Sequence, residues 1–174
     1  RLLGANVVLT DYLPKGVAAT YQQYHYIIAN PQPVSRRKLL DNAEDGSSYS
    51  AAHALYHPLL RSSAQQVGFY DLMIADARTG RIIYGMLKEE DFGTSLRIGP
   101  YRDTNLAAVL AHCASSADGS KTCLEDFSAY LPSGGKPTAF MGAPIIDQGV
   151  VTGVLIAQMP IDEIDDTVTG GRRW

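Results

Sequence analysis

Two runs of apolar residues around one turn decide the fold: GFYDLMIAD at residues 68–76 and RIIYGMLKE at residues 81–89. Thr79-Gly80, between them, supplies residue types that favour a tight turn. Apolar and aromatic runs on both sides of such a turn are typical of an antiparallel β-hairpin. The sequence therefore predicts strands over residues 69–76 and 81–88, followed by a charged loop that contains Asp91 and Thr94.

The rest of the chain predicts helices before this hairpin and a second hairpin after it. Residues 2–30 have a helical pattern with a kink expected at Pro14, and one face of it carries Tyr21, Tyr24, Ile27 and Ile28. The other expected elements are helical turns at 35–40, a helix at 50–66 kinked at Pro58, a helix at 106–114, strands at 122–130, 138–146 and 150–159, and a helix that begins at Pro160.

This order of elements predicts an α+β fold in which long N-terminal helices cover one face of an antiparallel sheet. The other face of the sheet is then free to form a pocket. We expect a helical region over residues 1–67 and a sheet-bearing domain over residues 68–168. Residues 169–174 read as the start of a connection to a further segment, so we interpret the 174-residue chain as a fragment of a larger protein.

Composition excludes several classes of function. The net charge of −3 provides no basic patch for nucleic acid. No apolar run reaches the roughly 18 residues that span a membrane, so any membrane attachment is expected through segments outside this chain. The sequence has no phosphate-binding loop, dinucleotide fingerprint or GxSxG motif, and we expect neither catalysis nor a cofactor.

Two pairs of residues invite a covalent or metal interpretation. Cys113 and Cys123 flank a polar loop. They either form a disulfide, which suits an oxidising compartment, or remain reduced thiols. His53 and His57 have the four-residue spacing that can bind a metal on one helix face, but no third ligand accompanies them. Hydrogen bonding is the favoured role for these histidines.

Several segments, taken in order, resemble one known family. They resemble the extracytoplasmic PAS-like (Cache) sensor domains of bacteria, in particular the membrane-distal half of double-Cache domains in chemotaxis receptors, sensor histidine kinases and membrane cyclases. The segments are YIIANPQP at 26–33, SYS at 48–50 with His53, YHP at 56–58, FYD at 69–71, KEEDFGTSL at 88–96, GPY at 99–101, DFSAYLPS at 126–133, API at 143–145, and GVL at 153–155 through QMPID at 158–162.

The resemblance implies a PAS-like fold, a periplasmic location as part of an inner-membrane protein, and a signalling role. In such receptors the domain binds a small ligand and transmits a conformational signal. Amino-acid-binding members carry an Arg and Trp pair near a Tyr, whereas the only tryptophan here is Trp174. The resemblance therefore assigns no amino-acid ligand to this chain.

The second strand of the first hairpin carries the first candidate site residues. The two-residue period of a strand places Ile82, Tyr84, Met86 and Lys88 on one face. The Lys88 ammonium would neutralise an anionic ligand, and Tyr84 would add a hydroxyl group and a ring. Alternatively, Lys88 is solvated and pairs with a neighbouring carboxylate.

Other candidates lie on the loops and strands that would surround the same pocket. Asp71 and Asp126 either hold a ligand or have structural hydrogen bonds, and Phe140 forms a pocket wall or plain core. Thr94 and Tyr101 lie on loops that would cover the sheet. The candidate ligand-binding residues are Tyr84, Met86, Lys88, Asp91, Thr94, Tyr101, Asp126, Tyr130 and Phe140.

Two functions remain open at this point. The first is a ligand-sensing domain for an unknown small molecule, with an anion favoured by Lys88. The second is a dimerisation or partner-binding module without a small ligand, in which the tyrosine-bearing N-terminal helix pairs with its twin in a homodimer.

Overall fold

The computed structural model describes residues 16–116 and 121–159. The first half of the expected N-terminal helix with its Pro14 kink, the helix expected from Pro160, and the connection expected at residues 169–174 lie outside the described residues. In the described part, none of the helices has the length and hydrophobicity of a membrane-spanning segment.

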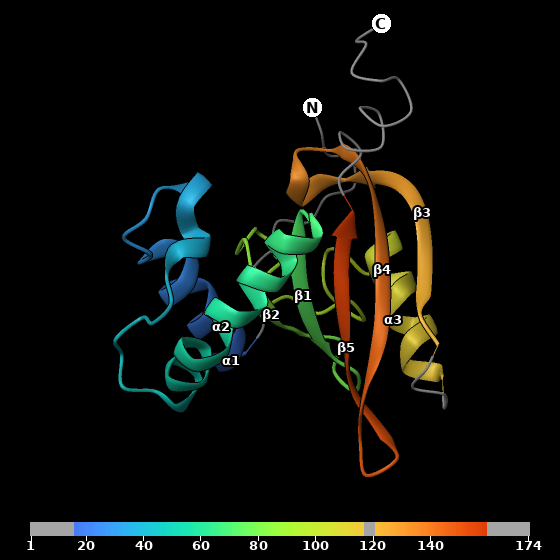
Figure 1. The fold of residues 1–174 in the computed structure, drawn as a ribbon, viewed down its shortest axis with the longest axis horizontal. Coiled ribbons are helices and arrows are strands. Elements are labelled where there is room, and N and C mark those ends of the chain that lie inside the picture. Colours follow the sequence, from blue (N-terminus) through green and yellow to red (C-terminus); the bar gives the residue numbers. More distant parts are fainter. Residues whose placement is uncertain (1–15, 117–120, 160–174) are drawn as a thin grey trace, which may run out of the picture.

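Five antiparallel strands form one sheet in the order β2-β1-β5-β4-β3 (Figure 1). Both expected hairpins are present, β1–β2 and β4–β5, and the expected α+β class with an antiparallel sheet is confirmed, in an arrangement consistent with a PAS-like fold. β1 runs beside β5 in continuous register from Asp71 opposite Gln158 to Asp76 opposite Gly153. The strands are β1 (Asp71–Asp76), β2 (Ile82–Gly85), β3 (Cys123–Tyr130), β4 (Lys136–Asp147) and β5 (Val150–Met159).

Helix α2 (Ser48–Val67) covers one face of this sheet, in front of β1 in Figure 1. The Ser47 side chain caps its first turn by accepting a hydrogen bond from the Ser50 amide. Gly68, in the left-handed conformation, ends it. The helix runs through Pro58 as one continuous element. Its Leu60 and Ala64 side chains belong to the cluster that also contains Leu72, Tyr84, Met86 and Ala157 of the sheet side.

Helix α3 (Asn105–Ser115) covers the opposite face and lies beside β3 and β4. Gly142 of β4 lets the helix approach closely, because a Cβ there would come within 2.5 Å of a Val109 methyl carbon and 3.1 Å of Cys113 Sγ. The larger hydrophobic core lies under this helix. Its members include Met73, Ala75, Ile82, Leu106, Val109, Leu110, Tyr130, Phe140, Val154 and Ile156.

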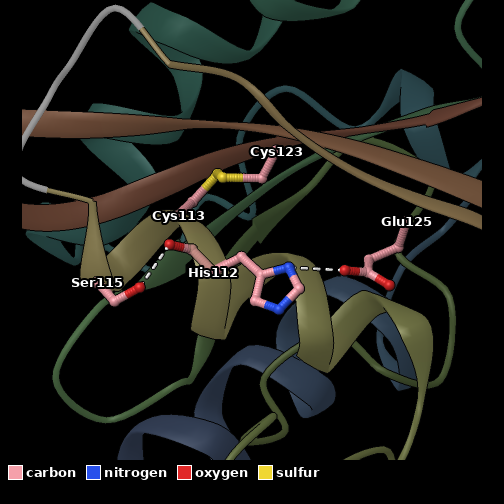
Figure 2. The surroundings of a disulfide bond; sticks show 5 residues. All are labelled: His112, Cys113, Ser115, Cys123 and Glu125. Atoms are coloured by element: carbon pink, nitrogen blue, oxygen red, sulfur yellow. Dashed lines mark hydrogen bonds and ion pairs between the residues drawn. A yellow bond between two sulfur atoms is a disulfide. The ribbon is translucent and has the colours of Figure 1, made fainter.

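A disulfide fastens the end of α3 to the start of β3 (Figure 2). It joins Cys113 and Cys123, whose Cα atoms are 5.8 Å apart. Of the two states considered for these cysteines, a disulfide or two reduced thiols, the structure contains the disulfide. On the outer side of the bridge, His112 Nδ1 lies 2.7 Å from Glu125 Oε1, which adds a second contact between the same two elements.

The N-terminal segment folds into short helical pieces, and the four residues of the expected face, Tyr21, Tyr24, Ile27 and Ile28, differ in exposure. Tyr24 and Ile28 are 53% and 74% exposed, whereas Gln22 and Tyr26 are buried. The helix changes from α to π geometry at Tyr24, which widens the turn and moves Tyr26 toward the core. The pieces are α1 (Val17–Gln23), the π-helix η2 (Tyr24–Ile28) and the 3₁₀ helix η3 (Val34–Leu39); a further 3₁₀ turn, η4 (Leu131–Ser133), follows β3.

Candidate ligand-binding site

A β-bulge splits the candidate face of β2 between the two sides of the sheet. Ile82 lies opposite Ala75 and Tyr84 opposite Ile74, with a shift of register between them. One extra residue on β2 therefore interrupts the alternation of its side chains. Ile82 joins the core under α3, whereas Tyr84 joins the cluster under α2. The prediction of one shared face was wrong, and β2 ends at Gly85, before Met86 and Lys88.

Lys88 is fully buried, which contradicts its interpretation as a solvated residue at a strand end. Its φ angle of 58° turns the chain sharply after β2. The Nζ atom donates to the Met86 carbonyl oxygen at 3.3 Å and lies 5.8 Å from the centre of the Tyr26 ring. No carboxylate of the described residues forms an ion pair with it. Burial lowers the pKa of Lys88 to about 7.

Two stacked histidines of α2 lie beside this lysine. His57 Nε2 lies 2.8 Å from the Lys38 carbonyl oxygen and 3.5 Å from Lys88 Nζ, and Nδ1 lies 2.8 Å from the Tyr84 hydroxyl group. Because a carbonyl can only accept, Nε2 carries the proton and Nδ1 accepts from Tyr84. Burial lowers the pKa of His57 to about 3, so the ring is neutral. Hydrogen bonding, the favoured role for this histidine, is confirmed.

His53 repeats the arrangement one turn earlier in α2. Its ring stacks on His57 with centroids 4.3 Å apart, and its Nδ1 lies 2.7 Å from the Asp41 carbonyl oxygen. Burial lowers its pKa to about 4. Nδ1 therefore carries the single proton, and Nε2 is a buried lone pair that has no hydrogen-bond partner. Within residues 16–116 and 121–159, no three His, Cys, Asp or Glu side chains are arranged to hold a metal ion.

A cavity of about 590 Å³ lies beside Lys88, between η3, the end of α2 and the segment after β2. Three lysine or arginine residues, Arg37, Lys38 and Lys88, line it, against the single carboxylate of Glu89. Tyr70 and Ser35 add hydroxyl groups to the wall. The excess of cationic residues suits a small anion better than a cation.

On the α3 side of the sheet, four of the candidate residues pack around Tyr130. The Tyr130 hydroxyl donates to Asp91 Oδ2 at 2.5 Å, and its ring lies 6.2 Å from that of Tyr101 and 5.0 Å from that of Phe140, centre to centre. Thr94 Oγ1 donates to the Asp91 carbonyl oxygen at 2.7 Å. All five residues are buried, so this group is a packed part of the core.

Three carboxyl groups, those of Glu89, Asp91 and Asp71, have raised pKa values. Glu89 accepts from the Tyr70 hydroxyl at 3.1 Å and from Ser133 Oγ at 3.0 Å, and burial raises its pKa to about 7. Burial likewise raises the pKa of Asp91 to about 6. Asp71 accepts the backbone N–H groups of residues 72 and 87, and burial with the nearby Asp91 charge raises its pKa well above the usual range. The structural role considered for Asp71 therefore agrees with its contacts.

Asp126 is the one candidate that lies apart from the others. It is exposed on the edge strand β3, where its carboxylate accepts from the Phe127 amide and its carbonyl accepts from Asn105. Sequence reasoning missed Arg37 and Lys38 as cavity residues. The basic run at residues 36–38 was the available signal, but nothing local placed it opposite the end of β2.

No family model matches this chain, and no curated protein matches it. Among solved structures, the crystal structure of the V. cholerae histidine kinase DctB sensor domain is similar to it, with 15% sequence identity and a TM-score of 0.48. The match covers 88% of this chain and 52% of that one, so the chain spans about half the length of that sensor domain. At this level the similarity carries no argument about the site or its ligand.

Proposed function

We propose that this chain is an extracytoplasmic signal-sensing domain of a bacterial transmembrane receptor, and that it binds a small anionic ligand in the cavity lined by Lys88. The ordered segments that resemble Cache sensors and the antiparallel sheet with a helix on each face support the sensor class. The Cys113–Cys123 disulfide supports an oxidising compartment such as the periplasm. The domain itself has no catalytic role in this proposal, and membrane attachment belongs to segments outside this chain.

The observation that carries the proposal is the buried amine of Lys88, which forms no ion pair with a carboxylate in the part of the chain that the structure describes. A buried ammonium group is unfavourable unless an anion compensates it. The pKa of Lys88 is lowered to about 7 because burial disfavours its charged ammonium form. A ligand carboxylate close to Nζ would supply the missing charge, and the side chains of Arg37 and Lys38 on the cavity wall would add to the attraction.

Binding would then change the protonation of Lys88 as well as its contacts. An anion beside the amine favours the ammonium form, so the complex takes up a proton at neutral pH. Lys88 lies against His57 of α2, and His57 is bonded to η3 through the Lys38 carbonyl. A ligand that favours one arrangement of these elements shifts the population toward that arrangement, and this shift is the proposed signal.

Thermal-shift measurements with a panel of carboxylates, amines and purines test the proposal. A ligand that binds only the folded state raises the melting temperature, because it stabilises that state by RT ln(1 + L/Kd), where L is the free ligand concentration. We expect carboxylates to give the hits, and Lys88→Met to lose them. Lys121→Met, at an exposed position before β3, is the matched control and should keep them. Hits that survive Lys88→Met would remove Lys88 from the site.

A second candidate function, homodimerisation, is favoured by the exposed face of α2. Arg61 is the only charged residue in the 20 residues of this helix, and it is paired with Asp41 at 2.7 Å. Leu55, Tyr56 and Leu59 are 57–64% exposed without a charge among them. Sedimentation at high protein concentration decides the matter, since a strict monomer would exclude this function.

A further inference from the structure

A second and larger cavity lies on the same side of the sheet, beside His57 and with its own set of lining residues. It is a groove of about 750 Å³ between α1, α2 and the β1–β2 hairpin, and it shares no lining residue with the Lys88 cavity. Its volume lies within the range of pockets for small molecules, roughly 300–1,000 Å³. We call it the aromatic groove, because its walls include Tyr21, Tyr49, His53, Tyr56, His57 and Tyr84.

The walls of the aromatic groove are almost without charge. Arg81 is the only arginine, lysine or carboxylate residue among its lining residues. His53 and His57 are neutral, since burial lowers both of their pKa values far below 7. Leu59, Leu60, Ile74 and Ile83 complete the apolar part of the wall. Aromatic and aliphatic walls of this kind favour a flat, uncharged ligand.

Two residues of the wall, His53 and Gln22, have a buried polar atom without a hydrogen-bond partner among the described residues. His53 is 5% exposed, and its Nε2 lone pair has no hydrogen-bond donor among the described residues. A buried acceptor without a donor is costly and is rarely left so in folded proteins. Gln22 also has an unpartnered oxygen, Oε1, but it lies 3.4 Å from where a Gly93 Cβ would be, so it faces that loop. His53 is therefore the acceptor that a ligand could satisfy.

We propose that the aromatic groove is a second ligand site, which takes a small uncharged aromatic molecule bearing an N–H or O–H donor for His53 Nε2. The aromatic walls supply the binding area, and the lone pair of His53 selects for the donor. The proposal does not depend on the anion site, because the two cavities have different lining residues, and only the Lys88 cavity has a cluster of cationic residues.

Indole serves as the test probe, with binding followed by chemical shift perturbation or calorimetry on the whole chain. Ala52→Trp fills the groove from an exposed position of α2 and should abolish saturable indole binding. Ala51→Trp places the same ring at the neighbouring exposed position, which does not line the groove, and should leave binding unchanged. Equal indole binding by the two variants would overturn the proposal.

A second comparison isolates the role of His53. 1-Methylindole has the same ring but no N–H, and it should bind the wild-type chain about fivefold more weakly than indole does. His53→Phe keeps a ring at this position but removes the acceptor, so the two probes should then bind alike. A wild-type chain that does not distinguish the probes would contradict the assigned hydrogen bond.

The control outcomes separate this site from the two functions proposed above. Lys88→Met should leave indole binding intact, and Ala52→Trp should leave carboxylate binding intact. If instead the wild-type chain sediments as a dimer, and Ala52→Trp converts it to a monomer, a second copy occupies the groove and the ligand proposal is wrong.

Discussion

Replacing Lys88 with methionine should stabilise the domain at neutral pH, although it removes a charged residue. The Lys88 pKa falls from 10.5 to about 7 on folding, mainly because of burial. Each pKa unit corresponds to about 1.4 kcal/mol, so below pH 7 the buried amine destabilises the fold by up to about 5 kcal/mol. Methionine preserves an unbranched side chain and gives up one hydrogen bond to the Met86 carbonyl, worth about 1 kcal/mol.

The pH dependence of this gain distinguishes the electrostatic cause from better packing. Because the folded pKa is lower than the unfolded one, the unfolded state binds the extra proton between about pH 7 and 10.5. The destabilisation is absent above that window, grows as the pH falls through it, and is complete below it. Lys88→Met should therefore exceed the wild type by about 3 kcal/mol at pH 7 and by about 1 kcal/mol at pH 9, once the lost hydrogen bond is subtracted at both pH values.

Urea denaturation, monitored by circular dichroism at pH 7, 8 and 9, measures the free energy of unfolding of the wild type and of Lys88→Met. Titrating groups that do not interact with Lys88 are common to both proteins and cancel in the difference between the two free energies of unfolding. The buried carboxyl of Asp71, whose charge acts on Lys88, is the exception. Lys121→Met, at an exposed site, should show no gain at any pH. A gain for Lys88→Met that is the same at pH 7 and pH 9 would refute this account.

Three further outcomes follow from other contacts. The pKa of Glu89 is raised from 4.5 to about 7 in the folded state, so protonation of Glu89 stabilises the fold. This contribution is complete below about pH 4.5 and is lost as the pH rises through 7. Glu89→Gln should therefore flatten the dependence of the free energy of unfolding on pH over that window, as measured by urea denaturation. Removing the disulfide with Cys113→Ala and Cys123→Ala should lower the free energy of unfolding by about 2–3 kcal/mol. Gly142→Ala should lower the free energy of unfolding by about 1–3 kcal/mol in thermal denaturation, because the new methyl group would come within 2.5 Å of a Val109 methyl carbon. Gly149→Ala is the control: its methyl group meets no atom within 4 Å, so it measures the strain of a positive φ alone.

The elements that depend on local signals could be predicted from the sequence. The β1–β2 hairpin follows from Thr79-Gly80 between two apolar runs, and α2 and α3 were each expected within two residues of their ends. Ser47 and Gly68 mark the start and end of α2 with residue types that favour those positions. Each of these signals acts over a few residues, so neighbouring sequence is sufficient to read it.

The site could be predicted only in part, because its geometry depends on contacts between distant segments. The bulge in β2 comes from its pairing with β1, and no residue type near Ile82 announces it. Lys88 precedes two glutamates, a pattern that favours a solvated side chain, yet its positive φ turns it inward against Tyr26 and His57. Asp126 follows the period of an edge strand, which the sequence could not distinguish from a central one.

The contact between Lys88 and His57 sets a condition on how the proposed signal can arise. His57 Nε2 donates its proton to the Lys38 carbonyl, so it offers no lone pair to Lys88 at 3.5 Å. A charged Lys88 would therefore face another donor, with only the Met86 carbonyl as its acceptor. In the proposed complex an anion in the cavity would provide a further acceptor, whereas without it the contact between Lys88 and α2 would loosen when the amine is protonated. The proposed ligand binding and the position of α2 relative to β2 would thus be linked through one proton.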